Sequence, residues 1–384
     1  MDANRLLIVD DERPFAELVG RIAREADFDV RITEDPADFL VVLDRWQPSL
    51  VIVDLQMPGM DGIQLVRRMA EVGATCEVVL ASGFDVRTLE TASRLATEYG
   101  LTVVGTVQKP IRAAALRGML VALSRAATST EIGVQQLTEA IENDDLVVAY
   151  QPLIDIRSRG IVGVEALARW SPRRGIAIPP DQFIRLAEEN GLIRALTNRI
   201  LAKSIEQASL WQRAGAALQV AVNLSPACLD DLDFPDALAE CCAAAGLPPK
   251  LLRLELTETA AMQDAARMMD ILTRIRLKGF DLSLDDFGAG YSSLRQLHRL
   301  PFTELKIDRS FITDLATSRD SQVITKTIID MAHNLGLTVV AEGIEDSGAL
   351  QQLTDYGCDH GQGYLISRPV PAGEVDTAAR WPDL

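Results

Sequence analysis

Residues 50–62 read LVIVDLQMPGMDG, a short apolar run that leads directly into an aspartate. The run Leu50–Val53 is rich in Val and Ile without polar alternation, which is typical of a strand in a parallel sheet covered on both faces. Asp54 follows the run and stands at the carboxyl end of the predicted strand. Ligands of doubly wound sheets bind outside the carboxyl ends of the strands. The stretch therefore predicts a buried strand with an acidic side chain at the functional edge of its sheet.

Similar apolar runs lie on both sides of this stretch, separated by amphipathic segments such as Phe15–Arg24 and Ile63–Met69. The other predicted strands of this region are Arg5–Val9, Phe28–Ile32, Glu77–Leu80 and Leu101–Val107. Five strand–helix units in this length predict a small, doubly wound, five-stranded parallel sheet. We assign this domain to residues 1–124.

The segment Ser124–Ile132 (SRAATSTEI) has no strand pattern and carries small polar residues, so we place a linker at 125–133 and a second domain at 134–384. Its length of about 250 residues is enough for one α/β barrel, in which the carboxyl strand ends form the active face. The predicted strands are Leu146–Gln151, Gly163–Arg169, Leu218–Asn223, Leu252–Leu256, Asp281–Leu284, Glu304–Ile307, Thr338–Ala341 and Gly363–Leu365. The predicted fold class is α/β, a doubly wound domain followed by a TIM-barrel-like (β/α)8 domain.

The composition excludes several classes of protein. The 384 residues include 38 Lys and Arg against 55 Asp and Glu, for a net charge of −17, which disfavours a general nucleic-acid binder. The five cysteines are odd in number and form no CxxC motif, so neither a disulfide framework nor a thiolate zinc site is predicted. The start MDANRLLIVDDE does not read as a signal peptide, and no apolar run approaches the ~20 residues that cross a bilayer. We expect a cytoplasmic protein with no membrane insertion and no DNA partner.

Polar residues stand at four predicted strand ends of the first domain: Asp10 and Asp11, Asp54, Ser82, and Lys109. Three converging carboxylates repel one another unless a hard cation joins them, and Mg²⁺ prefers such oxygen ligands. The hydroxyl and the ammonium would suit a phosphoryl group on Asp54. Each residue alone has a simpler explanation, since Asp caps helices and lysines are common on surfaces. The five together, in this order, favour a site.

With VDLQMPGMDG and QKP as its motifs, the stretch 5–124 resembles a response-regulator receiver domain. The resemblance implies that Asp54 is the phosphoacceptor and that one Mg²⁺ is bound by Asp10 and Asp11 together with Asp54. It further implies that Ser82 and Lys109 sense the phosphoryl group. It also implies a sensor histidine kinase or phosphotransfer protein as partner. Thr106 stands where receivers usually carry a Tyr or Phe that turns inward on activation.

Acidic clusters follow the predicted strands of the second domain. They are GVEALARW with Glu165, VNLSP with Asn223, RLELTET with Glu255 and Glu258, SLDDFGAGYSS with Asp285 and Asp286, and VVAEGIE with Glu342, while Lys306 lies in ELKIDRSF. Unpaired acids converging on a barrel mouth would cost several kcal/mol per ion. Two divalent cations about 3.5–4 Å apart remove that cost and can activate a water for attack at phosphorus. Oxygen ligands with one amide favour Mg²⁺ or Mn²⁺ over zinc or copper.

The motifs differ in strength. Glu-Ala-Leu alone is common, whereas the doublet Asp285–Asp286 before a Gly-rich turn is difficult to explain structurally. Because adjacent strand residues face opposite sides, we expect the strand to end there so that both acids reach one site. No histidine lies in the clusters, and we interpret His360 in CDHGQGY as a hydrogen-bonded loop residue. Together the clusters resemble an EAL-type cyclic di-GMP phosphodiesterase over about residues 134–371.

This resemblance implies hydrolysis of cyclic di-GMP to linear pGpG under receiver control, and we expect a homodimer or higher homo-oligomer. The implied ligands of two metals are Glu165, Asn223, Glu255 and Asp285 for the first and Asp285, Asp286 and Glu342 for the second. The implied catalytic residues are Lys306, which would position the attacking water, with Glu342 and Glu165. The implied substrate-binding residues are Gln151, Leu167, Arg169 and Gln362. Glu258 would anchor the loop Phe287–Ser293, and the family's pattern is altered at Ala289 and Ile366.

Two other functions are less consistent with the sequence. A degenerate domain that binds the dinucleotide without cutting it should show replacements among the metal ligands or at Lys306, and the sequence has none. A bifunctional synthase–hydrolase or a transcription factor would need a GGDEF-like sequence or a DNA-binding domain, and neither is found. The enzyme is favoured.

Overall fold

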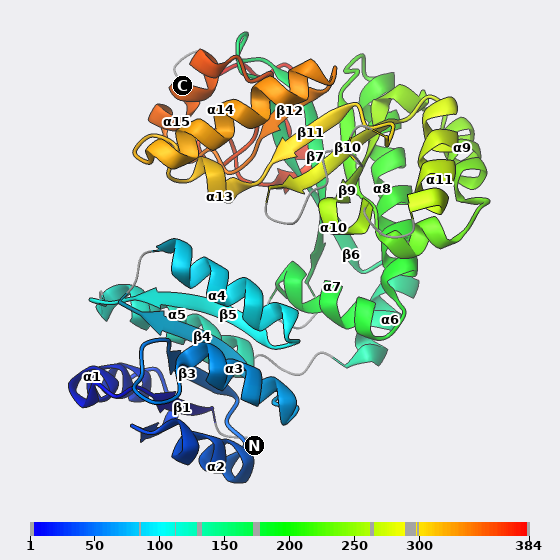
Figure 1. The fold of residues 1–384 in the computed structure, drawn as a ribbon. Coiled ribbons are helices and arrows are strands. Elements are labelled where there is room, and N and C mark those ends of the chain that lie inside the picture. The colour runs from blue at the N-terminus through cyan, green and yellow to red at the C-terminus, as the bar shows by residue number, and fades with distance from the viewer. Residues whose placement is uncertain are drawn as a thin grey trace. The chain divides into compact units, whose positions relative to one another are not determined.

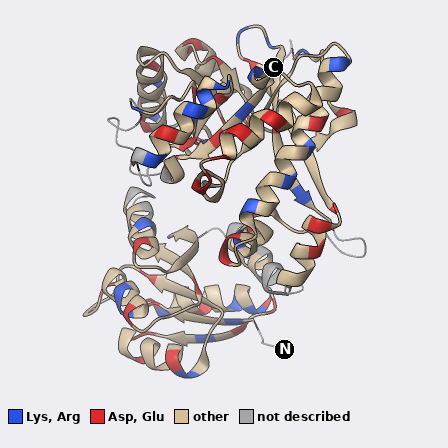
Figure 2. Cartoon of the chain, turned by 90° about the vertical axis from the view of Figure 1, so that its right-hand side faces the viewer, with Lys and Arg blue, Asp and Glu red and all other residues tan. Residues whose placement is uncertain are grey.

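The computed structural model describes residues 4–381 except 84–85, 112, 129–132, 172–176, 262–264, 289–296 and 298. The chain forms two compact units, Met1–Glu131 and Ile132–Leu384 (Figure 1). Lys and Arg are interspersed with Asp and Glu in both units (Figure 2). Among the described residues, no helix has the length and apolar character needed to cross a membrane.

The first unit confirms the predicted doubly wound sheet. Its strands are β1 (Arg5–Val9), β2 (Asp29–Thr33), β3 (Leu50–Asp54), β4 (Glu77–Ser82) and β5 (Thr102–Gln108), in the order β2-β1-β3-β4-β5 and all parallel. Its helices are α1 (Arg13–Arg24), α2 (Pro36–Trp46), α3 (Gly62–Glu71), α4 (Val86–Glu98) and α5 (Ala113–Thr128). One apolar cluster packs α2, α3 and α4 on the sheet and another packs α1 and α5, so both faces are covered. Helix α5 continues to Thr128, past the predicted domain end at residue 124.

The second unit is a closed eight-stranded barrel. Its strands are β6 (Leu146–Asp155), β7 (Ile161–Trp170), β8 (Gln219–Asn223), β9 (Leu252–Thr257), β10 (Asp281–Phe287), β11 (Glu304–Ile307), β12 (Thr338–Ala341) and β13 (His360–Gly361). Each strand pairs with the next, and β13 pairs with β6 to close the barrel. A short ninth strand, β14 (Val370–Pro371), pairs with β6.

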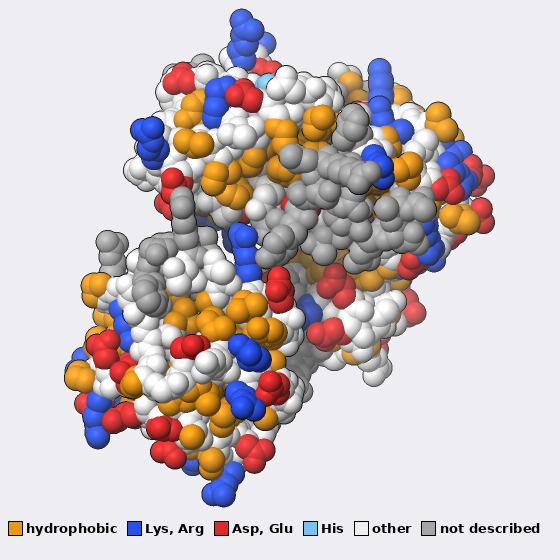
Figure 3. Space-filling view, in the orientation of Figure 1, with side chains coloured by type: hydrophobic (Ala, Val, Ile, Leu, Met, Phe, Trp, Pro, Cys, Tyr) orange, Lys and Arg blue, Asp and Glu red, His pale blue; other side chains and the backbone are white. Residues whose placement is uncertain are grey.

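Helices surround this barrel (Figure 1). They are α6 (Val134–Glu142), α7 (Pro180–Glu189), α8 (Ile193–Arg213), α9 (Phe234–Ala245), α10 (Glu258–Ala261), α11 (Ala265–Leu277), α13 (Arg309–Ile312), α14 (Arg319–Asn334) and α15 (Ser347–Tyr356). Short 3-10 turns lie at Pro226–Asp230, Pro249–Leu251 and Ala372–Glu374. Apolar side chains from strands and helices form one continuous core, and some remain among charged groups on the visible surface of each unit (Figure 3).

Two features of the barrel differ from the predicted parallel pattern. Strand β6 is antiparallel to both of its neighbours, β7 and β13. Only residues 156–160 separate β6 from β7, too few for the helical crossover that a parallel pair requires, so the two form a hairpin. The predicted strand Gly363–Leu365 is wrong, and the eighth strand is His360–Gly361. A Cβ on Gly363 would lie 2.1 Å from the Ile344 carbonyl oxygen, so this segment packs on a neighbouring backbone and does not extend the sheet.

Candidate functional site

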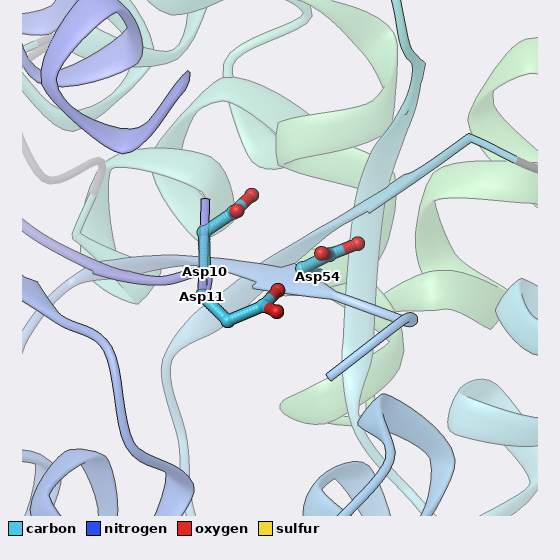
Figure 4. Close-up of side chains that lie close together, drawn as sticks. All are labelled: Asp10, Asp11 and Asp54. Atoms are coloured by element: carbon cyan, nitrogen blue, oxygen red, sulfur yellow. The ribbon is translucent and has the colours of Figure 1, made fainter. Parts of the chain in front are cut away.

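The carboxyl edge of the first sheet brings together three aspartates, as predicted. Oxygens of Asp10, Asp11 and Asp54 lie within 4.8 Å of one another (Figure 4). Asp10 and Asp54 are each only 1% exposed, whereas Asp11 is exposed. Lys109 Nζ lies 2.9 Å from Asp10 Oδ2 and 2.9 Å from Asp54 Oδ2. One ammonium thus faces two buried carboxylates, and the exposed third completes a set that suits a hard cation.

The other predicted members of this site lie on the next two strands. Ser82 is fully buried at the end of β4, and its carbonyl oxygen accepts a hydrogen bond of 2.8 Å from the Lys109 amide. Burial raises the pKa of Asp10, against the lowering effect of its hydrogen bond with Lys109. Thr106, on β5, is exposed. Asp10, Asp11, Asp54 and Lys109 therefore converge, and Ser82 contacts Lys109 through its backbone.

Two residues near this site were not singled out from the sequence. The Gln56 amide donates to Asp54 Oδ1 at 3.2 Å, and Gln56 Oε1 accepts from the Gly83 amide at 3.2 Å, which joins two loops beside the acidic cluster. A Cβ on Gly62 would lie 2.4 Å from the Asp54 carbonyl oxygen. The glycine of MDG is therefore required by the close approach of α3 to the end of β3. The need for glycine at position 62 is visible only from this contact in the folded structure.

In the barrel, the predicted site residues come from consecutive strands. The register aligns Gln151 of β6 with Glu165 of β7, and Asn223 of β8 with Glu255 of β9. Asn223 Nδ2 donates to Glu165 Oε1 at 3.0 Å. Gln362 Nε2 donates to Gln151 Oε1 at 3.0 Å and to Glu165 Oε2 at 2.5 Å. A line of amides thus fixes the orientation of Glu165.

Lys306 lies at the centre of the predicted metal ligands and is 2% exposed. Its Nζ lies 2.6 Å from a carboxylate oxygen of Glu342, 3.1 Å from Glu255, 3.3 Å from Asp285 and 3.7 Å from Glu165. These carboxylates come from β7, β9, β10 and the residue after β12, so the contacts cross the barrel interior. The charged groups of these strands therefore face one another inside the barrel, although Glu165 lies in the middle of β7 and not at its end.

Both members of the acidic doublet reach the site by a route that the sequence reasoning did not foresee. Oxygens of Asp285, Asp286 and Glu342 lie within 4.8 Å of one another. Strand β10 does not end at the doublet, because it continues to Phe287. Its register with β11 shifts between Leu284 and Phe287, and Asp286 adopts a φ of +55°. This irregularity re-aims one side chain, a common role of bulges beside active sites.

The predicted substrate residues Leu167 and Arg169 share a face of β7 with Glu165, since alternate strand residues point the same way. Arg169 donates at 2.8 Å to the carbonyl oxygen of Ala168. Among the described residues, no hydrogen bond or ion pair joins it to the acidic cluster. The two therefore line the same wall as Glu165 but are not part of the central network.

The predicted loop anchor makes the expected kind of contact. Glu258 is 3% exposed, and its Oε2 accepts a hydrogen bond of 3.1 Å from the Gly288 amide. The rest of the loop Phe287–Ser293, including Ala289, lies outside the described residues. Ile366 is buried and its amide donates to the Gly363 carbonyl oxygen.

The electrostatics of the barrel site fit divalent cations. Burial raises the pKa of Glu255 well above 4.5, that of Asp286 to about 6 and that of Glu342 to about 8. Neighbouring carboxylates contribute to these increases, and Lys306 partly opposes them. The pKa of Lys306 lies well above 10.5, since the four carboxylates outweigh the effect of its burial. Within the described residues, the buried Oε2 of Glu255 has no hydrogen-bond partner, as expected of an oxygen that serves a metal.

We therefore expect the metal-free barrel to lose stability as pH rises. A carboxyl group whose folded-state pKa exceeds its unfolded value stabilises the fold below the unfolded pKa, and this contribution is lost as pH rises through the folded pKa. For Asp286 and Glu342 that window extends from about pH 4 to pH 8. Calorimetry in EDTA should show a falling melting temperature for the barrel, and Mg²⁺ should remove most of the fall. In the Glu342→Gln variant, the decrease in melting temperature at the higher pH values, toward pH 8, should disappear. A metal-free melting temperature that rises steadily to pH 8 would contradict this account.

A second polar layer was missed. Arg253, Ser283 and Glu304 are buried in the barrel, and His360 lies close to them. The interpretation of His360 as a loop residue is wrong, because it is the first residue of β13, with Nδ1 3.8 Å from Glu304 Oε2. The signal available in the sequence was alternation, since each of these residues stands two positions before a predicted site residue.

Comparisons with known proteins match both units of the chain. The family models for the response regulator receiver domain and the EAL domain match residues 6–121 and 134–369. The chain is 29% identical over 383 residues to the cyclic di-GMP phosphodiesterase RocR of Pseudomonas aeruginosa, covering 97% of each chain. It is 40% identical over 240 residues to the signaling protein YkoW of Bacillus subtilis, covering 62% of this chain and 30% of that one.

A solved structure gives the same picture for the second unit. The structure titled "PaMucR Phosphodiesterase, c-di-GMP complex" aligns with a TM-score of 0.60 and 40% identity, covering 63% of this chain and 98% of that one. The chain spans about a third of the length of several curated relatives that it matches, and nearly the whole of RocR. The matches to these longer relatives cover 62–64% of this chain.

Proposed function

Because the chain belongs to the EAL domain family and carries a response regulator receiver domain ahead of its barrel, we propose that it hydrolyses cyclic di-GMP to linear pGpG under receiver control. The main observation in support is the buried cluster of four carboxylates around Lys306. RocR, a cyclic di-GMP phosphodiesterase by name, matches both units. A domain that only binds the dinucleotide is disfavoured, because every expected polar side chain is retained and the central ones converge.

The metal part of the proposal assigns two Mg²⁺ or Mn²⁺ ions to the barrel and one Mg²⁺ to the receiver. The residues that would hold the barrel ions are Glu165, Asn223, Glu255, Asp285, Asp286 and Glu342, and those of the receiver are Asp10, Asp11 and Asp54. Such ions supply Lewis acidity and lower the pKa of a bound water. The high pKa values and the unpartnered Glu255 oxygen support the barrel assignment.

The protein's own side chains have distinct tasks in this proposal. The raised pKa of Lys306 keeps its ammonium charged near neutral pH, so it serves as a hydrogen-bond donor that orients the attacking water and opposes negative charge at phosphorus. Glu342, 2.6 Å from that ammonium, holds it in place. Gln362 and Asn223 fix the carboxylate of Glu165 from two sides.

The substrate would lie along the wall formed by β6 and β7. Gln151, Leu167 and Arg169 are the proposed contacts, with the guanidinium of Arg169 on a phosphate, which its fork of N–H donors suits. Glu258 would hold the start of the loop that follows the acidic doublet, through its contact with Gly288. The proposed phosphoryl donor to Asp54 is a sensor histidine kinase or phosphotransfer protein in the cytoplasm, and the proposed assembly is a homodimer or higher homo-oligomer.

The direct test is turnover by the purified full chain. With Mg²⁺ or Mn²⁺ we expect the protein to convert cyclic di-GMP to pGpG, and chromatography of the reaction mixture measures the product. EDTA should abolish the reaction, and Ca²⁺ should inhibit it, because Ca²⁺ is larger and less demanding in its geometry. Activity that survives thorough chelation would overturn the metal assignment. Tight binding of cyclic di-GMP without turnover under all these conditions would instead favour the binding module.

A further inference from the structure

Four strands of the barrel carry a second polar residue beneath the proposed active site. Each lies two positions before a residue of that site, so both members of a pair face the barrel interior. The pairs are Arg253 and Glu255 on β9, Ser283 and Asp285 on β10, Glu304 and Lys306 on β11, and His360 and Gln362 at β13. The lower members therefore form a layer directly below the upper ones.

Glu304 is the centre of this layer and is 1% exposed. Its Oε1 accepts a hydrogen bond of 3.0 Å from Ser283 Oγ, on the neighbouring strand. Its Oε2 accepts a hydrogen bond from Nη1 of Arg253, whose side chain reaches across β10 from β9. His360 Nδ1 lies 3.8 Å from the same oxygen. One carboxylate thus connects three consecutive strands and approaches a fourth.

Stability alone gives a weak reason for this layer. Charges buried without water cost several kcal/mol each, and replacing a buried ion pair by apolar residues of similar volume is often neutral or stabilising. The layer is also incompletely paired, because within the described residues the buried Nε of Arg253 and Nδ1 of His360 have no hydrogen-bond partner. An apolar layer, as fills many α/β barrels, would avoid these costs.

The geometry offers a different reason. The strands that Glu304 ties together are those that carry Lys306, Asp285 and Glu255. The Lys306 ammonium lies 3.1 Å from a carboxylate oxygen of Glu255 and 3.3 Å from one of Asp285. Directional hydrogen bonds fix the rotation and register of strands more sharply than apolar packing does. A displacement of about 1 Å in a catalytic group can cost a factor of about 100 in rate.

We propose that Glu304, with Arg253 and Ser283, is a positioning cluster that aligns Lys306, Asp285 and Glu255 for the reaction. The cluster acts through these three groups and touches neither substrate nor metal. This inference rests on the proposed phosphodiesterase function, and it also concerns metal affinity, which can be measured without turnover.

The test compares the full-length double variant Arg253→Met/Glu304→Leu with wild type. If Arg253 and Glu304 have a purely structural role, the two apolar replacements should leave both folding and activity intact. The positioning role predicts a melting temperature near that of wild type, a kcat lowered at least tenfold with KM changed less than threefold, and Mn²⁺ affinity by calorimetry lowered several-fold. The matched control is Arg276→Met/Asp281→Leu, an ion pair at the start of β10, which should leave kcat and Mn²⁺ affinity unchanged.

Three outcomes decide the proposal. A folded double variant with wild-type kcat and Mn²⁺ affinity overturns it. If the double variant does not fold, Ser283→Ala, which removes only one hydrogen bond, should still lower kcat about threefold or more at constant KM, and an unchanged kcat overturns the proposal. If wild type itself shows no turnover, the proposed function fails, and the Mn²⁺ affinities alone then support or overturn the positioning role.

Discussion

Replacing Lys306 by methionine is expected to lower kcat by about 10²–10³-fold, the usual cost of losing one pre-organised donor from a buried site. The change removes the ammonium that lies within 4 Å of four carboxylates but keeps most of the apolar stem. KM should change much less, because the assigned partner of Lys306 is the attacking water. The affinity for Mn²⁺ should rise, since a positive charge beside the proposed metal ligands is lost.

A lower kcat together with a higher Mn²⁺ affinity in Lys306→Met would distinguish the catalytic role of Lys306 from a structural one. Glu165→Ala removes a proposed metal ligand, so it should lower Mn²⁺ affinity and turnover together. Lys326→Met, at an exposed lysine paired with Asp330 on α14, should leave both unchanged. Steady-state kinetics and calorimetry on the three variants provide the measurements. A Lys306→Met enzyme with near-normal kcat would mean that the assigned role is wrong.

The strands that carry both sites could be predicted because their signals are local. An apolar run such as Leu50–Val53 needs burial on both faces, and a charged residue directly after it must lie at the sheet edge. The order of Glu165, Asn223, Glu255 and Asp285 along the chain then follows the order of neighbouring strands. The closure of the barrel brings these four side chains together, so their common site could be predicted from the sequence.

Other features depend on contacts between distant segments. The left-handed conformation of Asp286 and the register shift after Leu284 depend on pairing with β11, which leaves no local signature. The reversed direction of β6 was readable from the short connection to β7 but was overlooked. The alternation along the strands places Arg253 and Glu304 on the same face as the site residues, but their ion pair joins residues 51 positions apart in the sequence, which no local pattern indicates. The eighth strand was misplaced because QGYL has an apolar pattern, whereas Gly363 packs on the Ile344 backbone.

The receiver should accept a phosphoryl group at Asp54 and no longer do so in Asp54→Asn. Its carboxylate lies 2.9 Å from Lys109 Nζ and shares a cluster with Asp10 and Asp11, an arrangement suited to an acyl phosphate and its Mg²⁺. Incubation with Mg²⁺ and a small-molecule donor such as acetyl phosphate should give one acid-stable, base-labile phosphoryl group by mass spectrometry. The matched control is Asp61→Asn, an exposed helix-capping aspartate in the connection after β3, which should still be labelled.

Phosphorylation should also change the phosphodiesterase rate without any change in the barrel's own residues. The phosphoryl group adds up to about two negative charges, which can act at a distance only by biasing an element with two arrangements. Because Thr106 is exposed and has no ring to turn inward, we expect the signal to pass through the Lys109 and Ser82 backbones, which are joined by a hydrogen bond of 2.8 Å. Beryllofluoride with Mg²⁺ should alter the wild-type rate at least threefold and leave Asp54→Asn unaffected. Equal rates for wild type with and without beryllofluoride, at several protein concentrations and with labelling of Asp54 established, would show that the receiver does not control catalysis.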